Sequence, residues 1–194
     1  MTCIPTVIEI GAPKNLTERA PKEQKCYAFL DRLGVFYRRA DHEAASTMEL
    51  CREIETQLGC PICKNLLLTN RQQTDFYLLL MEGEKVFKTK YLSRELGVAR
   101  LSFATDEQME ELLDITPGSL SVLGLLNDPE KRVRLIIDRP ILGKPEIGFH
   151  PCLNTSTLAV SIGDFCDLII PALRHEPTIV NLPEEAPQSG EDEN

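Results

Sequence analysis

Two apolar runs joined by a short polar loop constrain the fold of this chain more than any other feature. Residues 62–69 and 75–81 are rich in leucine, and residues 70–74 between them are polar. Runs of this kind around a short loop predict a β-hairpin. Because side chains alternate along a strand, Lys64 shares a face with Leu66 and is the one charge on that face.

Lys64 needs an explanation, because an unpaired ammonium group on a buried face costs several kcal/mol. Three arrangements satisfy it: an ion pair, an extended side chain that reaches water at the sheet edge, or an anionic ligand. Spacing alone does not choose among them.

The remaining pattern predicts helices and strands that do not alternate one for one. Pro21 suits a first helical turn and Gly34 a helix end, Glu49 completes a capping box with Ser46, and Asp164 is a candidate cap. The expected helices are 21–33, 46–59, 91–96, 105–113 and 164–173, and the expected further strands are 35–40, 100–104, 133–138, 146–149, 155–161 and 178–182. This order predicts an α/β (α+β) fold with a mixed, largely antiparallel sheet surrounded by helices, not a doubly wound parallel sheet.

Length and composition indicate one domain with irregular ends. A chain of 194 residues is large enough for one well-packed domain and small for two. We expect an N-terminal arm over 1–20, the domain over 21–182 and an acidic disordered tail over 183–194.

Several features suggest a cytoplasmic protein. No run approaches the ~18 apolar residues that span a bilayer, and the first residues lack the pattern of a secretory signal, so we expect no membrane contact. The seven cysteines have no disulfide-like spacing, which favours a reducing compartment.

The net charge of −9 is unevenly distributed. Five of the 30 acidic residues lie in the tail, which leaves 25 acidic against 21 basic residues in 1–183. Basic residues gather at Lys85, Lys88, Lys90, Arg94 and Arg100, and again within 131–139. Such clusters are more often solvated faces than binding sites, but they can contact a few phosphates.

The familiar catalytic and metal-binding motifs are missing. Cys60 and Cys63 have redox-motif spacing but run into a strand, and a zinc site would need two more nearby ligands, so we expect ordinary thiols and no metal. The sequence has no nucleophile elbow, phosphate loop or His-Glu-x-x-His pair. His42 fits a solvated loop and His175 a helix C-terminus.

Two turns carry the remaining candidates. His150 precedes Pro151 between two strands, where its imidazole either faces a pocket or is bonded within the turn. The run 116–119 (Thr-Pro-Gly-Ser) is a turn whose backbone N–H groups can bind an oxyanion. Each feature alone is weak.

In combination these motifs resemble the YbaK/prolyl-tRNA-editing superfamily, and most closely its free-standing alanyl-tRNA(Pro) deacylases. The resemblance covers about 21–182 and rests on Lys64-Asn65-Leu66, Thr116–Ser119 with 125–128, and 149–151 with Asn154-Thr155. It implies the expected fold and the hydrolysis of the ester that joins alanine to tRNA(Pro). It also implies no cofactor.

The resemblance assigns roles to individual residues. Lys64 is implied to hold the terminal nucleotide or the ester, with His150 as the second catalytic residue. Asn65, Gly118, Ser119, Asn154 and Thr155 are implied to bind the substrate around an aminoacyl pocket. The attacking group is implied to be water, assisted by a hydroxyl of the terminal adenosine, so that no protein nucleophile is needed.

Partners and alternatives follow from the same resemblance. We expect a monomer that binds the acceptor end of tRNA(Pro), with Lys85, Lys88, Lys90 and Arg94 as candidate phosphate contacts; a prolyl-tRNA synthetase is a second partner that the resemblance allows. The family's glycine loop commonly has proline four residues after the glycine, where this chain has Val122, which leaves the amino-acid preference open. The alternatives are a deacylase for cysteine or serine on tRNA, and a non-catalytic paralogue that binds tRNA or a synthetase.

Overall fold

The computed structural model describes residues 8–44 and 48–184. Its helices are α1 (Pro21–Leu33), α2 (Met48–Leu58), α3 (Thr89–Glu95), α4 (Asp106–Leu113), α5 (Ile162–Asp164) and α6 (Ile170–Leu173), with 3-10 turns at Leu16–Glu18, Val122–Asn127 and Arg139–Gly143. Its strands are β1 (Ile8–Ile10), β2 (Tyr37–Asp41), β3 (Cys63–Thr69), β4 (Phe76–Glu82), β5 (Ser102–Phe103), β6 (Val133–Asp138), β7 (Glu146–Phe149), β8 (Ser156–Ser161) and β9 (Thr178–Val180).

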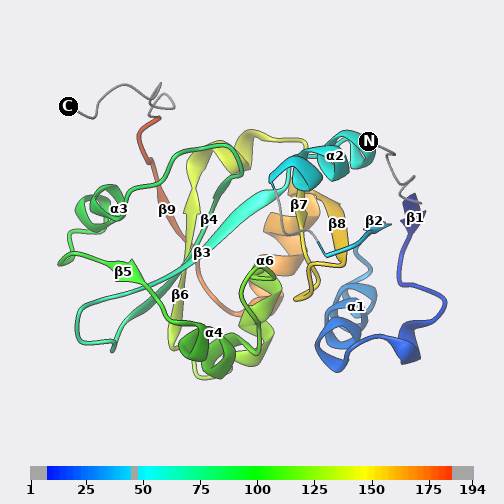
Figure 1. Cartoon of the computed structure of the whole chain (residues 1–194), viewed down its shortest axis with the longest axis horizontal. Coiled ribbons are helices and arrows are strands. Elements are labelled where there is room, and N and C mark those ends of the chain that lie inside the picture. Colours follow the sequence, from blue (N-terminus) through cyan, green and yellow to red (C-terminus); the bar gives the residue numbers. More distant parts are fainter. Residues whose placement is uncertain (1–7, 45–47, 185–194) are drawn as a thin grey trace.

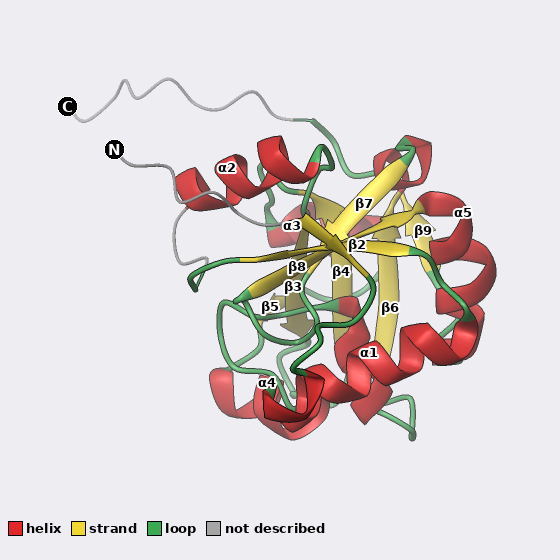
Figure 2. Cartoon of the chain, turned by 90° about the vertical axis from the view of Figure 1, so that its right-hand side faces the viewer, coloured by secondary structure: helices red, strands yellow, loops and turns green. Residues whose placement is uncertain are grey.

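The strands form two sheets, as Figures 1 and 2 show. One has the order β1-β2-β8-β7 and is antiparallel throughout. The other has the order β5-β3-β4-β6-β9, in which β4 pairs with β6 and β6 with β9 in parallel. The predicted mixed, largely antiparallel class is confirmed, with the strands divided between two sheets.

The hairpin that dominates the sequence is present. β3 and β4 pair antiparallel from Cys63 opposite Glu82 to Thr69 opposite Phe76. The polar loop closes through the side chain of Asn70, whose Oδ1 accepts from the backbone N–H of Thr74 at 2.9 Å. The short polar loop therefore fixes the hairpin register.

The two sheets meet at one close backbone contact. Ile62, just before β3, forms a parallel bridge with Gly148 of β7, and the N–H of Gly148 donates to the carbonyl of Pro61 at 2.7 Å. A Cβ atom at Gly148 would lie 3.2 Å from that carbonyl oxygen. Glycine thus lets β7 lie against the start of β3, and this contact brings the turn after β7 close to the hairpin.

Apolar side chains on opposite faces of the hairpin enter different cores. Leu67 and Leu78 belong to the main core, which also contains apolar residues of α1, α4, β7 and β8. Leu68 and Leu79 belong to a smaller core with Leu92 of α3. The alternation predicted from the sequence therefore separates two hydrophobic layers.

The ends of several elements differ from the sequence prediction. The helix expected from Asp164 begins at α5, because the Ser161 hydroxyl accepts from the N–H of Asp164 at 2.9 Å and is the cap. The chain continues through one wide helical turn, Phe165–Ile169, into α6. The proposed capping box at Ser46 lies outside the described residues, although α2 forms next to it.

The N-terminal segment contributes a strand to the fold. Within the predicted arm, β1 pairs with β2, so the four-stranded sheet reaches into the N-terminal segment. Residues 185–194 of the predicted acidic tail lie outside the described part. In residues 8–44 and 48–184, no helix combines the length and apolar character that crossing a bilayer requires.

Candidate active site

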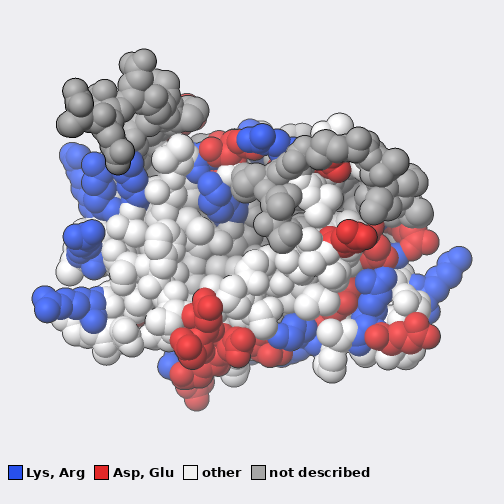
Figure 3. Space-filling view, in the orientation of Figure 1, with Lys and Arg blue, Asp and Glu red and all other residues white. Residues whose placement is uncertain are grey.

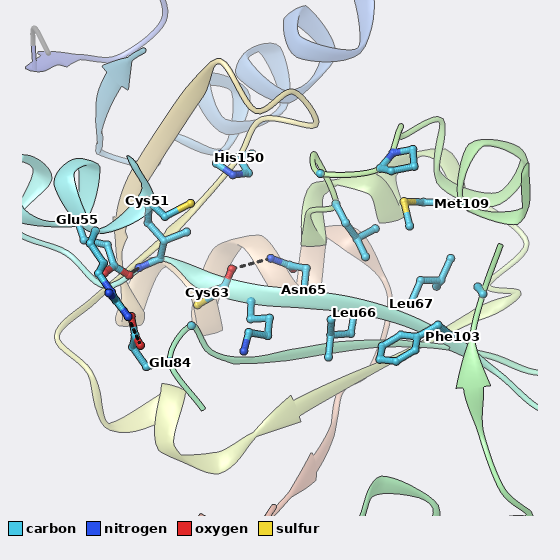
Figure 4. Close-up of a pocket in the computed structure, with 18 residues that line it drawn as sticks. Cys51, Glu55, Cys63, Asn65, Leu66, Leu67, Glu84, Phe103, Met109 and His150 are labelled. Carbon is cyan, nitrogen blue, oxygen red and sulfur yellow. Dashed lines mark hydrogen bonds and ion pairs between the residues drawn. The ribbon is translucent and has the colours of Figure 1, made fainter. Parts of the chain in front are cut away.

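A cavity of about 330 Å³ opens along the edge of β3, near the junction of the two sheets. Its walls come from α2, from β3, from the end of β5, from α4, from the 117–120 loop and from the turn after β7. Figure 4 shows these segments converging from distant parts of the sequence. Lys64, Asn65, Gly118 and His150, four of the predicted site residues, line it together.

The edge of β3 is open at this point because β5 is short. β5 pairs with Leu68 and Thr69, and within the described part of the chain no strand pairs with the first half of β3 on that side. Since side chains alternate, Asn65 and Leu67 project to one side of this edge while Lys64 and Leu66 project to the other. The cavity therefore has two sides that meet at one strand, as Figure 4 shows for Asn65 and Leu66.

Lys64 lies at the sheet edge, half-buried. Its ammonium group donates to the carbonyl oxygen of Lys85 at 2.8 Å, and no ion pair within the described residues neutralises it at contact distance. Burial lowers the pKa of Lys64, and the charge of Glu84 opposes that shift. Of the three arrangements open from the sequence, an extended cation beside the cavity is the one observed.

Asn65 carries an unsatisfied polar atom. Its amide nitrogen donates to the carbonyl of Cys63 at 3.1 Å, whereas its buried Oδ1 has no hydrogen-bond partner among the described residues. A buried acceptor without a partner costs about 1–3 kcal/mol. Asn65 is therefore set to accept a hydrogen bond from a molecule in the cavity.

His150 is held in one orientation on the Asn65 side. Its Nδ1 lies 2.9 Å from the carbonyl oxygen of Ser156, so Nδ1 carries the proton and Nε2 keeps its lone pair. Burial lowers the pKa of His150, and the neighbouring His42 adds to the shift. The ring is therefore neutral at physiological pH and offers a base or acceptor.

Hydrogen bonds behind His150 fix that position. The hydroxyl of Thr157 lies 3.3 Å from Nδ1 of His150 and 2.9 Å from Nε2 of His42. Ser156 is held in turn, because its hydroxyl bonds to Asp41 at 2.6 Å. His42 is thus half-buried and bonded, and the expectation of a solvated loop histidine was wrong.

The glycine loop forms a wall of the cavity. Gly118 has φ +82°, a conformation that costs other residues energy, and a Cβ atom there would lie 3.5 Å from the amide nitrogen of Asn154. Ser119 is buried, and its hydroxyl accepts from the N–H of Asn154 at 3.2 Å. Pro117 and Gly118 line the cavity, whereas Ser119, Asn154 and Thr155 do not.

Those three residues make contacts within the protein. Ser119 holds the loop against Asn154, and the carbonyl of Thr155 accepts from the N–H of His42 at 3.0 Å. Ser119, Asn154 and Thr155 lie outside the lining of this cavity, and their contacts with a substrate stay a prediction.

The candidate phosphate contacts fall into two groups. Lys85 is buried, and its ammonium pairs with Asp138 at 2.6 Å and donates to the carbonyl of Leu182 at 2.7 Å. It is therefore a structural residue, and its predicted role in phosphate binding was wrong. Lys90 and Arg94 are exposed on α3, and the ammonium of Lys90 lies over the ring of Tyr91.

Burial works against activation of Cys51, Cys60 and Cys63. Cys60 and Cys63 are buried; burial raises the pKa of Cys60 to about 12 and that of Cys63 further. Cys51 lines the cavity, and burial raises its pKa as well. Cys152 is buried beside Cys26, with the two sulfur atoms 3.4 Å apart, and it does not line the cavity.

Sequence reasoning missed several cavity residues. Met109 of α4, Leu120 and Phe103 complete apolar walls, and Arg52 pairs with Glu84 at 2.9 Å at the margin. Alternation in β3 could have assigned Leu67 to the Asn65 side. No local signal could have placed Met109 or Phe103, because their positions depend on how α4 and β5 pack against β3.

The arrangement suits a polar reaction at a small organic group. It combines a cation, an unsatisfied acceptor, a neutral imidazole and apolar walls that limit size. Within the described residues, no group of three or more metal-ligating side chains gathers.

Comparison with known proteins gives consistent matches. The family model of the aminoacyl-tRNA editing domain matches residues 42–168. The chain is 29% identical to a prolyl-tRNA editing protein of Acetoanaerobium sticklandii, over 73% of this chain and 87% of that protein. It is 28% identical to a prolyl-tRNA synthetase associated domain-containing protein of Mus musculus, over 84% of this chain and 96% of that protein.

A solved structure with a similar fold is titled as a candidate trans-editing enzyme for prolyl-tRNA synthetase. It superposes with a TM-score of 0.64 at 16% identity and covers 86% of this chain and all of that one. At this identity the likeness concerns the fold alone.

Proposed function

The chain belongs to the aminoacyl-tRNA editing domain family, and from that premise we propose that it hydrolyses the ester of alanine mischarged onto tRNA(Pro). It acts on the tRNA in trans, in the cytoplasm. The relatives from Acetoanaerobium sticklandii and mouse, whose names refer to prolyl-tRNA editing and to prolyl-tRNA synthetase, support this tRNA and a prolyl-tRNA synthetase as partners.

One observation carries the proposal. Lys64 and Asn65 are neighbours in sequence, yet they project to opposite sides of an open strand edge within one cavity. An aminoacyl nucleotide has two halves joined by an ester, with phosphate charge on one side and an ammonium donor on the other. The cation of Lys64 and the free Oδ1 of Asn65 match these two halves.

The chemistry requires no protein nucleophile. Water attacks the ester carbonyl, the bond to the ribose oxygen breaks, and the products are a free amino acid and a ribose hydroxyl. Nε2 of His150 accepts a hydrogen bond from the water or from the ribose hydroxyl that assists it, while Lys64 holds the nucleotide. Because an aminoacyl ester is already activated, positioning and charge stabilisation supply the catalysis.

The cavity walls select small amino acids. Leu67, Met109 and Pro117 surround the Asn65 side with packed apolar atoms. A larger prolyl ring must displace atoms that relax only at a cost, so a tight pocket excludes it. The converse discrimination is harder for a synthetase, since a missing methylene changes binding by only about 1–3 kcal/mol.

The test is single-turnover hydrolysis by the purified full chain of alanyl-, cysteinyl-, seryl- and prolyl-tRNA(Pro). We expect rapid loss of the alanyl ester and a spared prolyl ester. Faster hydrolysis of cysteinyl or seryl ester would identify the alternative substrate. Binding without hydrolysis of any ester would identify a non-catalytic paralogue, and equal rates on alanyl and prolyl esters would exclude a size filter.

A further inference from the structure

An exposed aromatic ring lies on the Lys64 side of the cavity. The side chain of Phe103 is 57% exposed, although it is a large apolar group, and it lines the cavity with Leu66 and Lys64. Figure 4 shows Phe103 beside Leu66, across β3 from His150. An exposed ring in a cavity wall offers contact area to a ligand.

The ring is supported from behind. Phe103 pairs with Leu68 in the β5–β3 ladder, so it lies on the same face of the sheet as Leu66 and Lys64. The ring of Phe87 meets it edge to face, with centroids 6.1 Å apart and planes at 69°. This contact fixes one part of Phe103 and leaves another part in solvent.

The order of side chains along this face matches the order of groups in a nucleotide. Phe103, Leu66 and Lys64 follow one another, from an aromatic face through an apolar side chain to a cation. A nucleotide likewise runs from a flat base through a sugar to a charged phosphate. Basic residues extend the match, since Lys90, Arg94 and Arg100 are exposed on α3 and just before β5.

The distribution of surface charge agrees with this placement. In Figure 3 Lys and Arg gather along the edge of the molecule where α3 and β5 lie in Figure 1, whereas Asp and Glu cluster over α4. These basic groups therefore attract a polyanion to the Phe103 side of the cavity.

We propose that Phe103 is a positioning residue on which the terminal nucleobase of the tRNA stacks, with the ester lying across the edge of β3 and the amino acid on the Asn65 side. The inference rests on the proposed function and specifies how its substrate is held. Every base has a π-face, so stacking of this kind gives affinity and orientation without sequence choice.

The experiment uses two acceptor-stem RNA hairpins. One ends in 3′-alanylamino-3′-deoxyadenosine, an amide that resists hydrolysis, and the other ends in the same group without the base. We expect wild-type protein to bind the first roughly 5- to 100-fold more tightly, the range that loss of one base–aromatic stack produces. Phe103→Ala and Phe103→Leu should lose this preference, and Leu keeps the apolar contact with Phe87.

Two further variants complete the design. Phe103→Trp should retain the preference, because it restores an aromatic face. Phe36→Ala is the matched control, since Phe36 is 59% exposed but does not line the cavity, and it should bind as wild type does. With alanyl-tRNA(Pro), Phe103→Leu should raise KM and leave kcat nearly unchanged, a split that a general loss of structure would not give.

Several outcomes would overturn the inference. They are equal wild-type affinity for both RNAs, no detectable binding of either, or a preference that survives in both Phe103→Ala and Phe103→Leu. The proposed function fails separately: wild-type protein that hydrolyses no ester yet shows a Phe103-dependent base preference retains the stacking site without the reaction.

Discussion

At the scale of single residues, two groups of opposite character meet at the cavity. Lys64 is a cation whose pKa burial lowers, and His150 is a neutral ring whose pKa burial also lowers. The charge of Glu84 opposes the shift of the Lys64 pKa. The site therefore presents a cationic donor and one lone pair.

Lys64→Ala should lower the single-turnover rate by about 10²-fold, because a substrate misplaced by about 1 Å can lose that much rate. The fold should survive, because among residues 8–44 and 48–184 the ammonium makes one hydrogen bond, to a backbone carbonyl. Circular dichroism and hydrolysis of alanyl-tRNA(Pro) measure both effects. Lys14→Ala, which changes an exposed lysine before α1, is the control. A near-normal rate for Lys64→Ala would remove Lys64 from the mechanism.

The pH profile should report His150. Its pKa lies below the ordinary value near 6.5, so the neutral, active form predominates at pH 7 and the rate falls as pH drops below 6.5. The same shift makes the unfolded chain bind more protons in that window, so His150 also lowers stability as the solution becomes acidic. The measurement is kcat/KM against pH for wild type and His150→Gln, corrected for spontaneous ester hydrolysis. An identical inflection in the variant would assign the titration to another group.

At the scale of elements, loops and their anchors shape the cavity. Lys85, in the turn between β4 and α3, pairs with Asp138 at the end of β6 and bonds to the segment after β9. The Lys85 carbonyl in turn accepts from Lys64. A buried ion pair thus holds the backbone that supports the catalytic lysine.

Lys85→Met should lower the free energy of unfolding by about 3–5 kcal/mol, because it leaves the Asp138 carboxylate buried without its partner. Urea denaturation measures this loss. Lys85→Met/Asp138→Leu should be less destabilised than the single variant, and Arg132→Met, which breaks an exposed pair with Glu111, should cost under about 1 kcal/mol. Equal small losses of stability in all three variants would contradict the structural role of Lys85.

Val122→Pro tests the loop in which this chain departs from the family pattern. Val122 is fully buried at the first position of its 3-10 turn and Ser121 before it is extended, so proline fits the backbone there. We expect a folded protein whose alanyl-to-prolyl rate ratio is equal to or above that of wild type. Loss of activity in a folded variant would mean that this loop serves a differently shaped pocket.

At the scale of the whole molecule, basic residues are gathered in a few places on a protein whose net charge is negative. The net charge of −9 opposes a broad grip on nucleic acid, yet basic groups gather near α3. In the second basic cluster, Arg132 pairs with Glu111 and Arg134 with Asp75. We therefore expect only a few phosphate contacts, mainly on the α3 side.

Affinity for tRNA should decrease modestly as the salt concentration rises. In a plot of log K against log salt, each phosphate contact contributes about −0.7 to −0.9 to the slope. The double variant Lys90→Glu/Arg94→Glu should make this slope less steep by the contribution of about two contacts. Arg134→Glu should change the slope little, because Arg134 is already paired with Asp75. Binding titrations with tRNA at several salt concentrations measure this slope. Affinity that is independent of salt in wild type would exclude this surface.

The sequence alone determined the local elements, because their signals lie within a few residues. Pro21 and Gly34 bound α1 as predicted, and the leucine runs around residues 70–74 give the hairpin and the face on which Lys64 lies. Motif order was enough to bring Lys64 and His150 to one site, as the shared cavity shows. Tertiary structure decided the rest.

Long-range packing determines which charges remain available and which apolar groups stay exposed. Lys85 looks like a surface lysine in sequence, but Asp138, 53 residues away, takes it into the interior. Phe103 looks like a core residue, but β5 is too short to cover the edge of β3, so its ring remains in the cavity wall. Such outcomes depend on contacts between segments far apart in the chain, and no periodicity within a segment records them.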